Sequence, residues 1–203
     1  AGIAGLFFAN LLKKNSDYKF TIFEKKTLLD AEDGYGIQLS VNSIKLLNEI
    51  GFSSVDKNLI YNPKKINFIN AKNNKKICDL DISKFNYKGN QYTTLKRSTL
   101  LRFLLSNISE DKIKFNTELE NFIYEKKLTL FFKDGSREDF DYLIVSDGVF
   151  STTKPIILKK ETKPKYFKSI ALRGNLDNYP NEDISIYFGS NFHFVIYPVN
   201  QKK

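Results

Sequence analysis

The chain contains 203 residues, of which 41% are hydrophobic, and its formal net charge is +9. This length and composition can bury one substantial core or two smaller ones. A single cysteine, Cys78, excludes an intramolecular disulfide and a cysteine-based metal cluster, and His193 is the only histidine. The sequence therefore predicts no metal site, and its cysteine usage suits a reducing cytoplasm.

The positive charge is spread along the chain. Lysine pairs fall at expected turns and helix ends, and only four of the 32 basic residues are arginine. No motif combines arginine with aromatic residues in the manner of a nucleic-acid reader, so an RNA-binding module is the least favoured class. The charge would instead help to attract anionic cofactors or substrates.

The first residues, Ala1-Gly2-Ile3-Ala4-Gly5, match the end of a G-x-G-x-x-G turn. In such a turn the glycines allow a tight bend and the close approach of a pyrophosphate, which binds at the helix N-terminus. The predicted helix has an apolar stripe of Ile3, Leu6, Phe7 and Leu11. A strand over 18–23 then ends in Glu24, 22 residues after Gly2, where a carboxylate can bind a ribose. A packing helix followed by a surface glutamate is the alternative interpretation.

The opening glycine of this motif and its strand would precede Ala1, and the chain has no methionine, so we expect a fragment of a longer protein. The apolar run over 1–12 is too short to span a bilayer and lacks the flanks of a signal peptide. No integral membrane segment is predicted.

The middle of the chain mixes turns, helices and a hairpin. Residues 34–40 form a glycine-containing turn, and a helix with Ile44 and Leu47 on one face ends at Gly51. A hairpin over 66–80 places Cys78 in the core of its second strand. A strand over 91–95 leads into a helix that Ser98 would cap.

The second half is rich in β patterns. Alternating apolar residues over 122–132 predict a meander, with turns at 126–127 and 134–135. The apolar run over 141–146 predicts a buried parallel strand that delivers Asp147 and Gly148 to its C-terminal end. Residues 169–174, 184–188 and 192–197 also look like strands.

This order of elements predicts an α/β fold, truncated at both ends. A Rossmann-like domain with a β-meander would comprise residues 1–56 and 91–159, and a β-rich domain would comprise 57–90 and 160–203.

Four blocks of sequence lie in order along the chain and can be compared together. They are the N-terminal glycine turn with Glu24, the segment 36–42 (GIQLSVN), Arg97 with Leu100, and the segment 141–151 (DYLIVSDGVFS). Together they resemble the FAD-dependent aromatic hydroxylases, flavoprotein monooxygenases that include the p-hydroxybenzoate, salicylate and ubiquinone-biosynthesis hydroxylases. The last block is the most specific, although Lys154 stands where the family usually has arginine. Residues 189–199 resemble a substrate-domain motif of the salicylate hydroxylase branch.

The resemblance implies that the first domain binds FAD and the second binds substrate. Gly2, Ala4 and Gly5 would contact the pyrophosphate, and Glu24 the adenosine ribose. The other implied cofactor residues are Gly34, Gly36, Gln38, Arg97, Asp147 and Gly148, although each by itself could be an ordinary turn residue or a solvated charge. A further family motif for FAD would lie beyond Lys203, so we do not expect the chain alone to be a competent enzyme.

Two side chains are candidates for contact with the substrate. His193 could orient or deprotonate a phenol, because an imidazole exchanges protons near neutral pH, or it could be a half-buried structural histidine. Arg173 could pair with a substrate carboxylate or cover a sheet edge.

The activity that the resemblance implies is hydroxylation of a small aromatic, phenolic substrate with NADH or NADPH, O2 and FAD. Two other classes remain open. One is a flavoprotein of the same fold with epoxidase or halogenase chemistry, and the other is an NAD-binding dehydrogenase or a non-catalytic Rossmann module.

Overall fold

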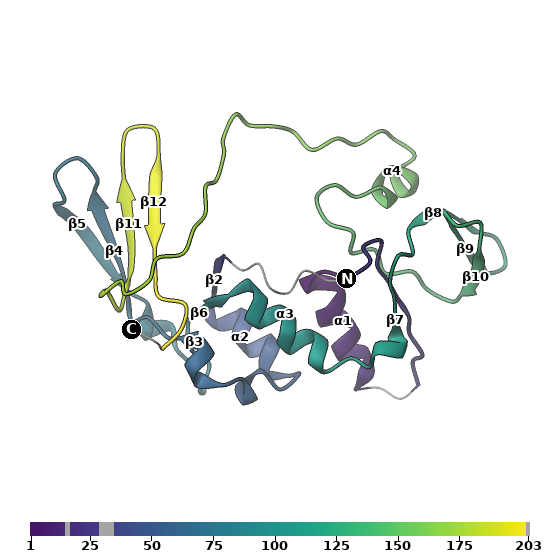
Figure 1. The fold of residues 1–203 in the computed structure, drawn as a ribbon, viewed down its shortest axis with the longest axis horizontal. Helices are drawn as coiled ribbons and strands as arrows, with labels where there is room; N and C mark the ends of the chain where they lie inside the picture. The colour runs from purple at the N-terminus through teal and green to yellow at the C-terminus, as the bar shows by residue number, and fades with distance from the viewer. Residues whose placement is uncertain (15–16, 29–34, 202–203) are drawn as a thin grey trace. The chain divides into compact units, whose positions relative to one another are not determined.

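The structure is a computed structural model, and it describes residues 1–14, 17–28 and 35–201. The chain forms two compact units, each built from two separate stretches (Figure 1). The first unit comprises Ala1–Asp30 and Leu104–Ala171, and the second comprises Ala31–Phe103 and Leu172–Lys203. Gly34, which the resemblance places near the flavin, lies outside the described residues.

The first unit begins with helix α1 (Ile3–Lys13). Gly2 precedes it with an extended backbone, and the Leu6 N–H donates to the Gly2 carbonyl at 3.0 Å. Leu6 is fully buried, and the other members of the predicted stripe are half-buried, so the predicted apolar face is confirmed.

A buried asparagine fastens α1 to helix α3 (Arg97–Ser106). The Asn10 amide donates to the Leu6 carbonyl at 2.8 Å and to the Leu104 carbonyl at 2.9 Å. A buried amide needs such partners, because leaving its donors unpaired would cost about 1–3 kcal/mol. The hydrophobic pattern gave no sign of this contact.

Two small sheets complete the first unit. Strand β1 (Ile22–Phe23) pairs in parallel with β7 (Ile113–Lys114), which follows the 3₁₀ turn η4 (Glu110–Lys112). Strands β8 (Leu119–Tyr124), β9 (Leu128–Phe132) and β10 (Arg137–Phe140) form an antiparallel meander. The predicted meander is confirmed, whereas β1 is shorter than the predicted strand over 18–23.

The core of the first unit lies between the meander and β1. Leu128, Leu130 and Phe132 alternate along β9 and are buried. The ring of Phe23 lies 4.6 Å from that of Phe132 and 5.7 Å from that of Phe140, measured between centroids. Offset and edge-on aromatic pairs of this kind each add about 0.5–1.5 kcal/mol beyond the area that they bury. The alternation predicted from sequence thus becomes the packing that joins the two sheets.

The predicted strand over 141–146 is not formed. No strand among the described residues pairs with this segment, and Tyr142 and Ile144 are 80% and 54% exposed. A strand requires a hydrogen-bonded neighbour, which an apolar run cannot supply by itself. Helix α4 (Thr153–Leu158) follows this segment.

One layer of the second unit is a three-stranded antiparallel sheet in the order β2-β6-β3, comprising β2 (Gly36–Leu39), β6 (Thr93–Lys96) and β3 (Ile60–Tyr61). Helix α2 (Val41–Asn48) buries Ile44 and Leu47, as predicted, and Gly51 follows it with a φ of +93°. The 3₁₀ turns η1 (Phe52–Ser54) and η2 (Lys57–Leu59) connect α2 to β3.

The other sheet has four strands in the order β12-β11-β4-β5: β12 (His193–Ile196), β11 (Ile184–Phe188), β4 (Lys65–Asn70) and β5 (Lys76–Asp81). The two hairpins are more than a hundred residues apart in sequence, yet β11 pairs in parallel with β4 (Figure 1). The Asp183 carboxylate fixes this junction, accepting the backbone N–H groups of Lys64 and Lys65 at 3.0 and 2.9 Å. The turn η3 (Ile82–Phe85) follows β5.

Three local expectations in these regions are wrong. Cys78 lies on β5 as predicted but is exposed, because β5 is the edge strand of its sheet. Helix α3 begins at Arg97, so Ser98 is a buried residue of its first turn and not its cap. Residues 169–174 form no strand, and Leu172 is 90% exposed.

Candidate functional site

The N-terminal turn and Glu24 meet within the first unit. The Glu24 carboxylate lies against the backbone nitrogen of Ala1, at the start of the glycine turn, and accepts the Lys26 N–H at 2.9 Å. A carboxylate therefore lies beside this turn, although 22 residues separate it from Gly2.

The space around this turn differs from one glycine to the next. A Cβ built on Gly2 would meet no atom within 4 Å, so the backbone there is open to a ligand. A Cβ on Gly5 would lie 3.5 Å from the Ser146 Cβ, which is an ordinary contact. Ala4, between them in the first turn of α1, is exposed. The first turn of the helix is thus accessible, and Gly5 faces the segment that leads to Asp147.

Asp147 and Ser151 organise the start of α4. The Thr153 N–H donates to the Asp147 carboxylate at 3.1 Å, and the Lys154 N–H donates to the Ser151 hydroxyl at 2.9 Å. Burial would raise the pKa of Asp147, but hydrogen bonds from Ser151 and Thr153 hold it below its ordinary value. Gly148 between them has a φ of +79°, which favours glycine. The D-G-x-x-S block therefore has a structural role in this chain, whatever it binds.

In the second unit, the C-terminal segment covers the start of β2. A Cβ on Gly36 would lie 2.7 Å from the ring of Tyr197 and 2.8 Å from the Val199 side chain. The Thr94 hydroxyl, on the neighbouring strand, donates to the Pro198 carbonyl at 2.5 Å. The absence of a side chain at Gly36 is thus what lets residues 197–199 lie across this sheet.

Gln38 lies between two tyrosines beside Gly36. The Tyr92 hydroxyl donates to the Gln38 Oε1 at 2.8 Å. Burial raises the pKa of Tyr197, which the charge of Arg173 and a hydrogen bond from Gln38 partly offset. Burial also raises the pKa of Tyr92. All three side chains are half-buried, and sequence reasoning did not select either tyrosine as a site residue.

The two arginines that the sequence singled out both contact Tyr35. The Arg97 N–H donates to the Tyr35 carbonyl at 2.9 Å, and the Arg173 guanidinium lies 4.0 Å above the centre of the Tyr35 ring. A cation over an aromatic face at this distance is attractive by about 0.5–2 kcal/mol. Arg173 is therefore held over Tyr35, the residue directly before β2.

His193 begins β12 and is exposed. Its register partner is Phe188, whose ring stacks parallel to that of Phe68 at 6.1 Å between centroids. Because side chains alternate along strands, His193 lies on the face of the sheet that also carries Phe68 and Phe188. An aromatic ring could lie against this face.

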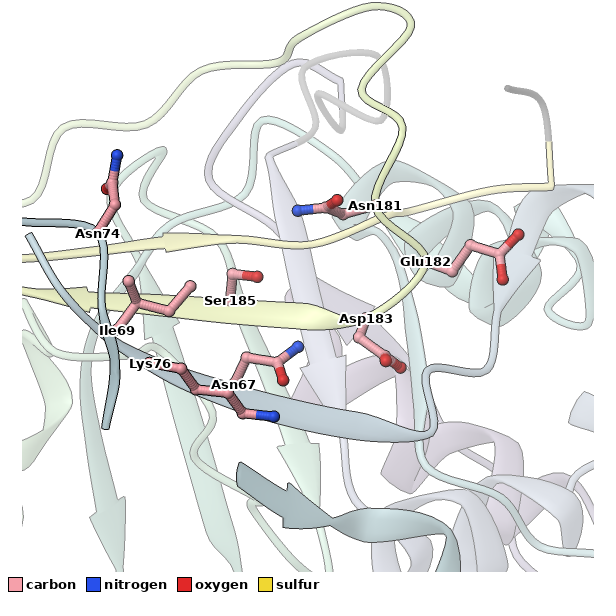
Figure 2. Close-up of a pocket in the computed structure, with 8 residues that line it drawn as sticks. All are labelled: Asn67, Ile69, Asn74, Lys76, Asn181, Glu182, Asp183 and Ser185. Carbon is pink, nitrogen blue, oxygen red and sulfur yellow. The ribbon is translucent and has the colours of Figure 1, made fainter. Parts of the chain in front are cut away.

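A shallow hollow of about 240 Å³ lies on the opposite face of the same sheet (Figure 2). Its lining is mostly polar and includes Asn67, Ser185, Asn181 and Asp183. It contains none of the residues that the sequence predicted for a site. The hollow is therefore not the site that the sequence predicts. The predicted site residues lie elsewhere, in the hydrogen-bonded groups described above.

Metal and membrane features are absent from the described residues. Within residues 1–14, 17–28 and 35–201, no three His, Cys, Asp or Glu side chains are grouped to hold a metal ion. No helix in this part of the chain has both the length and the apolar character needed to cross a bilayer.

The predicted residues thus fall in two groups. The first unit contains Gly2, Ala4, Gly5, Glu24, Asp147 and Gly148, and the second contains Gly36, Gln38, Arg97, Arg173 and His193. Within the first unit, the structure brings Glu24 to the glycine turn and Gly5 to the segment before Asp147. Within the second, it holds Arg97 and Arg173 against Tyr35, while His193 lies on its own strand pair.

No family model matches the sequence. A curated relative, 3-amino-4-hydroxybenzoate 2-monooxygenase PtnB3 of Streptomyces platensis, is 24% identical over 209 residues, covering 98% of this chain and 51% of that protein.

Two solved structures share the fold. HpxO of Klebsiella pneumoniae, in complex with FAD and uric acid, aligns with a TM-score of 0.82 at 19% identity, over 97% of this chain and 51% of that one. The 2,6-dihydroxypyridine-3-hydroxylase of Arthrobacter nicotinovorans aligns with a TM-score of 0.78 at 15% identity, over 100% of this chain and 51% of that one.

The chain shares the fold of these two structures, and the α/β class that its sequence predicted is confirmed. It spans about half the length of the relatives that it matches.

The contact at Gly36 gives a direct test of the packing. We expect Gly36→Ala to lower the free energy of unfolding by about 1–3 kcal/mol, because the new Cβ would overlap Tyr197 and Val199. Gly174→Ala is the matched control, since a Cβ there meets no atom within 4 Å. Urea denaturation of the two variants measures the difference. Equal midpoints would show that residues 197–199 do not pack on β2.

The cap at α4 gives a pH-dependent test. We expect Asp147→Ala to reduce the free energy of unfolding by about 0.5–2 kcal/mol at pH 7, because α4 loses an acceptor at its first turn. The pKa of Asp147 is lowered in the folded chain, so this stabilisation is complete above the ordinary value of about 3.9 and is lost as the pH falls through the lowered value. Asp141→Ala, a nearby exposed acid, is the control. A difference between Asp147→Ala and wild type that persists at the lowest pH would contradict this origin.

Proposed function

We propose that the chain is part of an FAD-dependent monooxygenase that hydroxylates a small aromatic substrate using NADH or NADPH and O2. The observation that supports this most is the glycine turn at the start of α1 with the Glu24 carboxylate beside it, in a chain of which 97% follows the fold of a structure solved with FAD. The curated relative is named as a monooxygenase of an aminohydroxybenzoate.

The residues of the first unit fit the adenosine diphosphate part of FAD. The open backbone at Gly2 would let a pyrophosphate approach the first turn of α1, where unpaired N–H groups attract an anion. Ala4 and Gly5 belong to the same turn, and the Glu24 carboxylate would accept hydrogen bonds from the ribose hydroxyls. Asp147 and Gly148 would border this group from the loop before α4.

The second unit would surround the flavin and the substrate. Gly36 and Gln38 would line the loop near the flavin, and Arg97 would reach the cofactor from the start of α3. Arg173 would pair with a substrate carboxylate. His193 would orient or deprotonate a phenol over the apolar face formed by Phe68 and Phe188. When bound, FAD supplies the redox chemistry, while these side chains bind, orient and shield the ring.

The domains predicted from the sequence divide the chain at other residues than the two units of the structure. Residues 1–56 and 91–159 would form the FAD-binding domain, and 57–90 and 160–203 part of the substrate domain. We also propose a cytoplasmic location, which the free thiol of Cys78 supports.

The complete protein should purify with bound flavin. We expect a yellow protein whose NADH or NADPH oxidation accelerates when a phenolic or other aromatic acid is added, measured by visible absorbance and by the decay of absorbance at the nicotinamide band. A colourless protein that does not take up added FAD would contradict the assignment. Flavin with stoichiometric halide or alkene turnover would favour the halogenase or epoxidase class instead.

Replacement of the imidazole should separate substrate chemistry from flavin reduction. We expect His193→Ala to lower the hydroxylation rate by about 10²–10⁴-fold, the usual loss for one positioned acid–base group, with a smaller change in flavin reduction. Stopped-flow absorbance and product analysis measure the two steps. Asn191→Ala, an exposed residue just before β12, is the control. Unchanged product yield and pH profile in His193→Ala would assign the histidine a structural role.

A further inference from the structure

A tight turn in the second unit carries two exposed aromatic rings. It comprises residues 84–89, which begin within η3 and which we call the aromatic tip. Lys88 and Gly89 have φ values of +49° and +77°, and Tyr87 and Asn90 form an antiparallel bridge on either side of them. The Tyr87 N–H donates to the Asn90 carbonyl at 3.1 Å, and the Asn90 N–H donates back at 2.9 Å. This is the two-residue hairpin turn whose central residues both need a positive φ.

The base of the aromatic tip is fastened to the rest of the unit. Ile82, just before it, is buried, and so is Asn90, just after it. The Asn90 carboxamide oxygen accepts the amide of Asn48 from α2 at 2.8 Å, and its NH₂ group donates to the Tyr87 carbonyl at 3.0 Å. Hydrogen bonds at both ends therefore hold the backbone of the tip in one conformation.

This fixed backbone leaves its aromatic side chains in solvent. Phe85 and Tyr87 are each 61% exposed. A Cβ on Gly89 would meet no atom within 4 Å, so the end of the turn is surrounded by open space. Because so much of both rings stays in water, they contribute little to the core of the unit. Exposed aromatic side chains that gather on one short segment indicate an interaction site.

The charge beside these rings is positive. Lys84 and Lys88 are exposed, and the Lys88 Nζ lies 5.1 Å from the centre of the Tyr87 ring. The sequence contains no acidic residue between Asp81 and Glu110. A segment with exposed lysines and no acid of its own favours a negatively charged partner.

An anionic membrane surface fits the aromatic tip better than a protein does. Aromatic rings enter the headgroup region of a bilayer readily, and lysine side chains beside them are attracted by anionic lipids. A specific protein partner usually buries about 800 Å² on each chain, which is far more than one hairpin turn presents. The tip also lacks arginine, the basic residue that protein interfaces favour.

We propose that the aromatic tip is a docking site for a membrane surface that contains anionic lipids. Phe85 and Tyr87 enter the headgroup region, and Lys84 and Lys88 lie against the negative headgroups. Two rings and two lysines give weak, reversible binding and not permanent anchoring. The proposal does not depend on the proposed function, because the tip contains none of the residues assigned to FAD or to the substrate.

A tryptophan at the tip reports its environment directly, since this chain has no tryptophan of its own. In the complete protein, we expect the emission that Phe85→Trp adds over wild type to shift to shorter wavelength with vesicles of phosphatidylcholine and phosphatidylglycerol in equal parts. Vesicles of phosphatidylcholine alone should leave it unchanged. Tyr124→Trp is the matched control, because Tyr124 is 73% exposed and lies near a lysine pair, but directly beside Glu125.

Co-sedimentation with the same vesicles measures the strength of binding. We expect Lys84→Gln and Lys88→Gln each to lower the partition coefficient by about 5-fold, the usual contribution of one lysine near an anionic surface. Phe85→Ala should lower it by about 10-fold, because an apolar ring is lost. Lys126→Gln is the control for lysine loss, and a higher salt concentration should weaken binding of the wild type. Flavin content and NADH or NADPH oxidation without vesicles should be unchanged in all of these variants.

Three results would overturn the proposal while leaving the proposed function intact. One is equal binding to the two kinds of vesicle, or an equal shift at positions 85 and 124. Another is a wild-type partition coefficient in the lysine and phenylalanine variants. The third is Phe85→Trp emission that is already at short wavelength without vesicles, since another part of the complete protein would then cover the tip.

Discussion

The packing of the second unit depends on the absence of a side chain at Gly36. Gly36 leaves the space into which the Tyr197 ring and the Val199 side chain pack, and no larger residue fits there without displacing them. This contact brings a segment near the C-terminal end of the chain onto β2, which lies in its first quarter. The approach also brings Tyr197 to the sheet on which Gln38 accepts the Tyr92 hydroxyl at 2.8 Å. The same glycine belongs to the block that resembles the flavin-binding loop, so under the proposed function packing and binding would both constrain this position.

In the first unit, carboxylates organise the loops that the proposed function needs. Asp147 and Ser151 accept backbone N–H groups at the start of α4, and Glu24 accepts the Lys26 N–H beside the glycine turn. For Asp147, these hydrogen bonds lower the pKa against the effect of burial. The residues that resemble a cofactor site are thus also local structural anchors. A motif residue can both bind a ligand and stabilise the fold. For variants of such a residue, the stability of the protein must therefore be measured as well as its ligand binding.

The helices, meander and hairpin that depend on local residue patterns were predicted correctly from the sequence. The stripe on α1, the helix that ends before Gly51, the meander around β9 and the hairpin of β4 and β5 all formed. Each depends on periodicity and turn chemistry within a few residues. The run over 141–146 shows the limit, because an apolar sequence does not form a strand without a hydrogen-bonded neighbour. Cys78 shows a second limit, because the burial of a side chain on a strand depends on whether that strand lies at the edge of its sheet.

The sequence by itself determined the class of fold, because this follows from the order and spacing of the elements along the chain. It also singled out Glu24, Gln38 and Arg173, one by one, as polar residues of interest. Only the tertiary structure decided which of them meet. The contacts of Asn10 with the end of α3, of Asp183 with the start of β4, and of Tyr92 with Gln38 join residues far apart in sequence. Such contacts leave no periodic signal, because they depend on how sheets and helices pack and not on the order of neighbouring residues.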